Sequence, residues 1–165
     1  MSNVEILLED NRWANINLEK LVGNAFYQTL LELGYSKSDF SLSVLACSDK
    51  KMKELNHTFC SKDTSTNVLS WPSRERLAFV EGNHPLRLDP ALDAELGDIA
   101  LSYDTCLEEA TQSKINFAFH VQHLIIHGIL HLLGYDHSSY QDATLMEDLE
   151  RQILGNLNLK PHTQL

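Results

Sequence analysis

Five of the eight histidines in this sequence lie between positions 120 and 137. Two of them, His127 and His131, are four residues apart, so on a helix both imidazoles face the same side and can reach one ion. Gly134 permits the left-handed conformation that ends many helices, after which the chain can turn back and present His137. Three neutral imidazoles leave one position of Zn²⁺ open, as in catalytic sites. The spacing therefore predicts one zinc ion per chain, held by His127, His131 and His137.

The same spacing, HxxxHxxGxxH, occurs in the metzincin proteases. Those enzymes place a Glu directly after the first histidine ligand as general base, whereas this chain has Gly128. General-base catalysis contributes about 10²–10⁴-fold to a rate, so its loss disfavours peptide hydrolysis, and a zinc metalloprotease with an unusual base is kept only as a third hypothesis. No side chain is assigned as catalytic; the reactive group would be a zinc-bound water. His120 and His123 are interpreted as packing residues or as hydrogen-bond partners of the ligands.

The elements that must position these ligands follow from hydrophobic periodicity. The ligands fall on a predicted helix, Asn116–Leu133, and a second helix follows at Ser139–Leu154. Upstream, the pattern predicts helices at Leu18–Gly34 and Asp104–Thr111, a short helix after Asp49, and strands at Ser41–Cys47, Asn67–Trp71 and Gly97–Tyr103. Between Pro72 and Leu96 we expect a long loop, which either covers a site or is a surface insertion. We predict an α+β fold, a small mixed β-sheet packed with helices and a metzincin-like zinc helix and loop.

Composition places the chain among ordinary globular proteins. It has 165 residues, of which 43% are apolar and 22% charged, which predicts a single domain over residues 1–165. There is no run of apolar residues long enough for a membrane span, and the first residues do not form a signal peptide. The three cysteines are widely spaced and indicate neither disulfides nor a cysteine zinc site. We therefore expect a cytoplasmic protein without a membrane partner.

The formal net charge of −10 argues against a surface that coats nucleic acid broadly. The basic residues are nevertheless unevenly spread, because segment 50–76 holds six of the thirteen whereas residues 115–150 hold none. If the protein binds an anion, this segment is the expected side, although a solvated surface is an equally good interpretation. Its basic residues are Lys50, Lys51, Lys53, Lys62, Arg74 and Arg76.

Residues 127–137, His-Gly-Ile-Leu-His-Leu-Leu-Gly-Tyr-Asp-His, closely resemble the signature of the YbeY family of bacterial endoribonucleases, also called rRNA maturation factors. Two further stretches match in family order, namely Leu55-Asn56 followed by Lys62-Asp63 and Thr66–Pro72, and Leu96-Gly97-Asp98-Ile99. The acidic helix with Met146, Glu147 and Glu150 also fits, so the resemblance runs from about Leu55 to Leu154.

This resemblance implies a small α+β fold with zinc on the three histidines, and a metal-dependent endoribonuclease specific for single-stranded RNA. It also implies a role in small-subunit (16S) rRNA 3′-end maturation and in ribosome quality control, with rRNA and ribosomal proteins as partners. Lys62, Arg74 and Arg76 are the expected substrate-binding residues, and Trp71 either stacks on a base or belongs to the core. Two routes stay open, attack by water and attack by the RNA's own 2′-hydroxyl. Three imidazoles also suit nickel, iron or copper.

One position departs from the family pattern. Where the family usually has an Arg, this chain has Cys60. An Arg could clamp a phosphate through two parallel hydrogen bonds, which a Cys cannot do. Either Lys62 or another base compensates, or this member cleaves weakly; Cys60 as a fourth metal ligand would close the open position. The departure keeps a second hypothesis open, a non-catalytic ribosome-assembly factor with a structural zinc.

Overall fold

Alternating apolar residues form the strand at the centre of this fold. Strand β2 (Ser41–Cys47) has its predicted bounds, and Leu42, Val44 and Ala46 are buried on one of its faces. Helix α1 (Leu18–Glu32) begins at the predicted cap, because the side chain of Asn17 accepts a hydrogen bond from the N–H of Lys20. Its apolar stripe is buried against the sheet and helix α5 (Phe117–Leu132).

The computed structural model describes residues 3–60, 62 and 64–157; Ser61 and Asp63 of the motif around Lys62 lie outside this part. The remaining elements are β1 (Val4–Leu8), α2 (Asp49–Cys60), β3 (Val68–Pro72), α3 (Pro90–Asp93), β4 (Glu95–Ser102), α4 (Tyr103–Ser113), α6 (Tyr140–Asn156) and two short 3₁₀ helices (Asn11–Asn15 and Lys37–Asp39). None of the helices in this described part is both long and apolar enough to cross a membrane.

The four strands form one mixed sheet in the order β1-β2-β4-β3. Strand β2 lies parallel to both β1 and β4, whereas β3 runs antiparallel to β4 and forms one edge. The predicted α+β class with a small mixed sheet is therefore confirmed. Gly97 of β4 has a φ of 140°, and a Cβ there would lie 2.2 Å from the carbonyl oxygen of Trp71, so only glycine allows the two strands to pair this closely.

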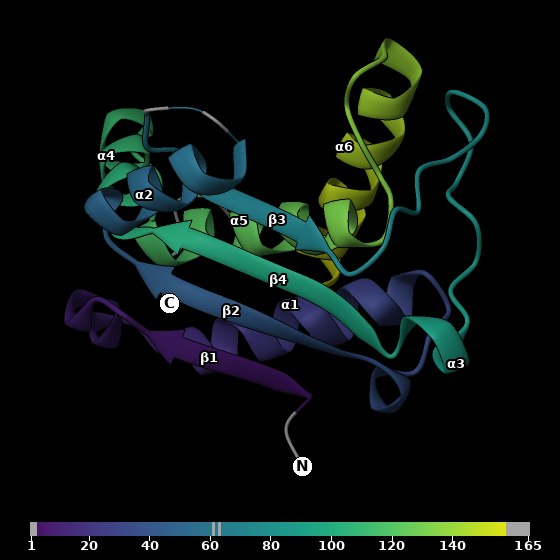
Figure 1. Cartoon of the computed structure of the whole chain (residues 1–165), viewed down its shortest axis with the longest axis horizontal. Coiled ribbons are helices and arrows are strands. Elements are labelled where there is room, and N and C mark those ends of the chain that lie inside the picture. Colours follow the sequence, from purple (N-terminus) through teal and green to yellow (C-terminus); the bar gives the residue numbers. More distant parts are fainter. Residues whose placement is uncertain (1–2, 61, 63, 158–165) are drawn as a thin grey trace.

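The helices lie on both faces of this sheet (Figure 1), but unequally. The main core lies between one face and helices α1, α5 and α6, with residues such as Phe26, Ile99 and Ile126 fully or almost fully buried. On the other face, α2 covers only a small cluster around Met52 and Ala100. Helix α5 packs closely on β3 and β4, which places it directly under the edge of the sheet.

Two parts of the fold differ from the sequence prediction. Strand β1 was not predicted, because its five residues, Val-Glu-Ile-Leu-Leu, do not alternate and Leu7 remains 64% exposed. The predicted loop from Pro72 to Leu96 contains the short helix α3, and β4 already begins at Glu95. This loop is tied to the rest of the fold, since Arg87 donates to the carbonyl of Gly34 after α1 and the Gly82 N–H donates to Asp142 of α6.

Candidate metal centre

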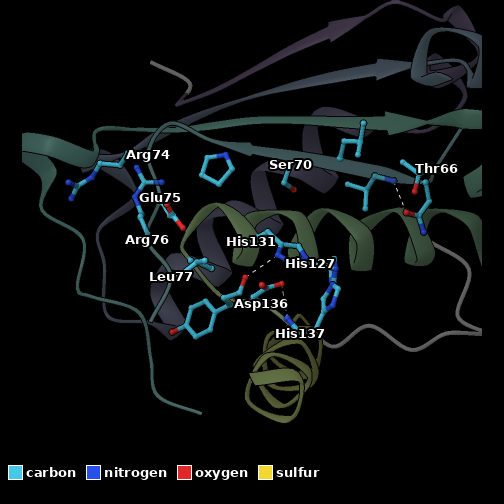
Figure 2. A pocket seen from close by; sticks show the side chains of 16 residues that line it. Thr66, Ser70, Arg74, Glu75, Arg76, Leu77, His127, His131, Asp136 and His137 are labelled. Atoms are coloured by element: carbon cyan, nitrogen blue, oxygen red, sulfur yellow. Dashed lines mark hydrogen bonds between the residues drawn. The ribbon is translucent and has the colours of Figure 1, made fainter. Parts of the chain in front are cut away.

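Helix α5 and the turn after it bring the three predicted ligands together. The helix begins at Asn116, whose side chain accepts from the N–H of Phe119, and it ends before Gly134, which has a φ of 105°. This left-handed residue reverses the chain, so His137 returns to His127 and His131. One ring nitrogen from each of the three histidines lies within 4.8 Å of the others. Figure 2 shows the three side chains converging on one side of a groove.

The outer nitrogens of two of these histidines have hydrogen-bond acceptors. His131 Nδ1 lies 3.0 Å from the carbonyl oxygen of Tyr135, and His127 Nδ1 lies 3.4 Å from Oε2 of Glu150. A carbonyl or an ionised carboxylate accepts but does not donate, so each Nδ1 must carry the proton. In a neutral imidazole this leaves the lone pair on Nε2, and the two Nε2 atoms face each other at 3.1 Å.

This arrangement fits a metal ion. Two lone pairs at 3.1 Å repel each other unless a cation lies between them, and neutral imidazole nitrogen is a good ligand for zinc and other transition metals. Burial and the charges of His127 and His137 lower the pKa of His131 to about 4, so His131 stays neutral and able to bind metal at physiological pH. Among the described residues, this is the one cluster with three suitable ligands close enough for one ion.

Gly128 is explained by the packing of α5 against the sheet. A Cβ at this position would lie 3.2 Å from Cδ1 of Ile99 and 3.2 Å from Oγ of Ser70. The hydroxyl of Ser70 also donates to the carbonyl oxygen of Gly128, at 3.2 Å. The position where metzincin proteases carry their Glu therefore faces the sheet here, and a long acidic side chain has no room.

The groove beside the histidines is open to solvent and has a volume of about 650 Å³. One wall is formed by residues of edge strand β3 and the segment before it, together with Arg74–Leu77; the β3 side comprises Thr66–Ser70 and Pro72. Helix α5 and the turn 134–137 form the other wall. Figure 2 shows Thr66 at one end, Arg74–Leu77 at the other and the histidines between them. An extended chain lying in the groove would pass directly over the proposed ion.

The three predicted substrate-binding residues lie in different surroundings. Arg74 lines the groove with half of its side chain exposed, although it also donates to Asp93. Arg76 also lines the groove, but it is only 7% exposed and its donors bind Asp93, Ser73 and two backbone carbonyls, so its guanidinium is already engaged inside the protein. Lys62 is exposed but does not line the groove.

Cys60 and Trp71 lie away from the histidines. Cys60 is exposed at the end of α2 and is not part of the three-histidine cluster, so the cluster has no fourth ligand from this residue. Trp71 contacts Phe59 edge-on, with 5.6 Å between ring centroids. It lines an apolar cavity that also includes Leu45 and Leu55, which belong to the small cluster on the opposite face of the sheet from the main core. The core interpretation of Trp71 therefore agrees with its position.

Two carboxylates at this site had no assigned role in the sequence analysis. Asp93 is fully buried; burial would raise its pKa, but hydrogen bonds from Arg74, the Asp89 N–H and Arg76 lower that pKa to about 2. Nothing in the sequence around Asp93 marks it as a partner of these arginines. Glu150 could have been recognised in the sequence, because it lies on the buried stripe of α6 with Met146 and Leu149, where an apolar residue is expected.

Comparisons with known proteins find similar sequences and a similar fold. The profile of the family described as Endoribonuclease YbeY matches residues 4–158. A curated "Endoribonuclease YbeY" of Dinoroseobacter shibae is 46% identical over 160 residues, covering 96% of this chain and 88% of the relative. One from Bartonella henselae is 35% identical and covers 100% of this chain and 99% of the relative. The solution structure of TM1509 from Thermotoga maritima has the same fold, with a TM-score of 0.59, 21% identity and coverage of 98% of this chain and 96% of that one.

Proposed function

This chain belongs to the YbeY family of endoribonucleases, and from that premise we propose that it cleaves single-stranded RNA at one zinc ion held by His127, His131 and His137. The observation that carries the proposal is the pair of Nε2 lone pairs 3.1 Å apart on the wall of an open groove. A closed structural site would surround the ion with four protein ligands, whereas here three histidines face a groove large enough for a polymer.

When bound, zinc supplies Lewis-acid chemistry, since it polarises a phosphoryl oxygen and makes water a stronger acid. The chain's own residues orient the histidine ligands and bind the substrate. The Tyr135 carbonyl and Glu150 direct the Nε2 atoms of their histidines to a common point. Arg74, which lines the groove with half of its side chain exposed, is the basic residue best placed to bind a phosphate. Arg76 instead holds the loop that forms the end of the groove.

The protease hypothesis has no support at Gly128. Its Cα faces Ile99 and Ser70, so the helix position that carries the protease base is packed against the sheet. A metal helix without a carboxylate at the position of the protease base suits a substrate that brings its own nucleophile. RNA does so through its 2′-hydroxyl.

In the cell, we assign this activity to maturation of the 16S rRNA 3′ end and to ribosome quality control, in the cytoplasm. The family relationship supports this role. The net charge of −10 supports a requirement for context, because a strongly acidic protein is repelled by bulk RNA and would need a ribosomal particle or ribosomal protein to bring it to its substrate.

The decisive experiment compares cleavage of a single-stranded RNA by the wild type, His131→Ala and His120→Ala, purified identically. His120 lies on the same helix but binds Glu109 and no metal ligand, so it is the matched control. We expect the wild type and His120→Ala to cut and to contain about one zinc per chain, and His131→Ala to do neither.

Other outcomes have defined meanings. Equal cleavage by all three proteins would mean a contaminating nuclease or a site elsewhere. Zinc at one per chain without cleavage, on both free RNA and small ribosomal subunits, would favour the assembly-factor hypothesis. Cleavage of casein under conditions that leave RNA intact would favour the protease.

A further inference from the structure

A buried carboxylate on helix α6 forms hydrogen bonds with helix α5, which carries His127 and His131. Glu150 of α6 is only 8% exposed and lies among apolar residues of the interface with α5, including Met146 and Ile153. A lone ionised carboxylate in such surroundings is strongly disfavoured, so its partners decide what it does.

Those partners are two histidines of α5, one turn apart. Oε1 accepts from Nε2 of His123 at 2.8 Å, and Oε2 faces Nδ1 of the metal ligand His127 at 3.4 Å. Each oxygen of the Glu150 carboxylate therefore accepts from one histidine, and hydrogen bonds from two N–H groups favour the charged form of a carboxylate.

An ionised acceptor at Nδ1 has a direct consequence for metal binding. It keeps the proton of His127 on Nδ1, so the lone pair of Nε2 is directed toward His131, and it makes the imidazole a stronger donor to the ion. The negative charge also offsets part of the charge of a divalent ion held by three neutral ligands. His123 contributes by fixing the rotamer of the carboxylate.

We propose that Glu150 is the positioning residue of the metal centre, orienting His127 through Nδ1, and that His123 holds Glu150 in place. The proposal rests on the metal site proposed above, and it assigns roles to two residues on different helices that do not line the groove. His123 and Glu150 instead line a second cavity of about 460 Å³, which the ligands His127 and His137 also line.

The chain offers matched controls for both residues. Glu147 lies on the same helix, lines the same cavity and is exposed, so changing it alters the local charge without removing a partner of His127. His120 and Glu109 form a second histidine–carboxylate pair, at 3.0 Å, which does not involve a metal ligand.

The first measurement is the zinc affinity of each variant, by competition with a chromophoric chelator. Glu150→Met keeps the volume but removes acceptor and charge, and we expect its zinc affinity to fall about 10–100-fold. Glu150→Gln keeps one acceptor oxygen and should lose less, and His123→Gln should also weaken binding. Glu147→Met and His120→Gln should remain within about twofold of the wild type.

The second measurement separates orientation from general damage to the fold. In ¹⁵N NMR spectra of the zinc-loaded protein, the Nδ1–H of His127 should be protected from exchange with water in the wild type and in Glu147→Met. In Glu150→Met it should exchange rapidly, while the Nδ1–H of His131, bonded to the Tyr135 carbonyl, stays protected. If Glu150→Met does not fold, Glu150→Gln and His123→Gln carry the same comparison.

Zinc binding by Glu150→Met and Glu150→Gln within twofold of the wild type would overturn the proposal and leave the metal site intact. An equal loss in Glu147→Met would also overturn it, because charge on α6 would then be the cause. A wild type that takes up no zinc at all would overturn the proposed function itself, which is a different result.

Discussion

Arg76 and Asp93 form an ion pair of 2.9 Å in the interior, with both side chains almost completely buried. Arg76 also donates to the carbonyl oxygen of Leu132 at 2.8 Å, at the end of the metal helix. Through these contacts, Arg76 connects the long loop after β3 to the C-terminal end of α5, where the chain turns toward His137. A guanidinium held in this way stabilises the wall of the groove and is not free to bind a phosphate.

Removing the charge of Asp93 should destabilise the protein strongly. In Asp93→Asn, the buried Arg76 loses its counter-ion, and breaking a buried pair from one side costs about 3–5 kcal/mol. Urea unfolding monitored by circular dichroism measures this. The neighbouring Glu75 is exposed, so Glu75→Gln should change the free energy of unfolding by no more than about 0.5 kcal/mol. Equal stability of the two variants would contradict the structural role of the pair.

The same carboxylate makes stability depend on acid pH. In the folded protein the pKa of Asp93 is lowered from 3.8 to about 2, so folding is favoured by its ionised form. This contribution is complete above about pH 4 and is lost as the pH falls from about 4 to 2. The difference in unfolding free energy between wild type and Asp93→Asn should therefore shrink over this interval. Other carboxylates titrate in both proteins and cancel in the difference; a constant difference would contradict the lowered pKa.

Removing the metal should lower the thermal stability of the wild type. A ligand present at a hundred times its Kd stabilises a fold by about 2.7 kcal/mol, which for a chain of this size corresponds to a Tm shift of about 5–10 °C. Differential scanning calorimetry with and without a chelator tests this. His131→Ala, which lacks one ligand, should show no shift on chelation. An unchanged Tm in the wild type would argue against a resident ion.

Gly128 should not tolerate a side chain. In Gly128→Ala the new Cβ meets Ile99 and Ser70 at 3.2 Å, an overpacking that costs about 1–3 kcal/mol and outweighs the gain of about 1 kcal/mol in helix propensity. Gly23 in α1 is the control, because a Cβ there meets nothing within 4 Å and Gly23→Ala should be neutral or stabilising. The Tm of each variant, measured by thermal unfolding, tests this expectation. A higher Tm for Gly128→Ala than for the wild type would mean that α5 can move away from the sheet.

Placing at position 60 the arginine that the resemblance leads us to expect should strengthen RNA binding. Cys60→Arg adds an exposed cation two residues before Lys62, within the basic segment of the sequence. We expect cleavage to rise several-fold at low salt and the gain to shrink as salt increases, as for any added phosphate contact. Cys60→Ser changes the thiol without adding charge and should behave as the wild type. An unchanged rate in Cys60→Arg would mean that the missing Arg does not limit this member.

The sequence by itself determined those features whose causes are local. His127, His131 and Gly134 belong to one helix and its end, and His137 follows three residues later, so their spacing alone predicts that the ligands meet. Helix α1 and strand β2 were predictable for the same reason. The apolar periodicity of each lies within the element itself, and the Asn17 cap directly precedes α1. Strand β1 was not predicted, because it is a short edge strand whose apolar and polar residues hardly alternate. Its extended conformation depends on pairing with β2.

The tertiary structure decided which residues meet across elements. Glu150 reaches His127 from another helix, and Asp93 reaches Arg76 across the long loop; the sequence separations are 23 and 17 residues. Such contacts depend on how helices pack and where a loop folds back, which no local pattern contains. The tertiary structure also decides burial. Arg74 and Arg76 look equivalent in the sequence and both line the groove, but the folded chain leaves Arg74 half exposed and buries Arg76.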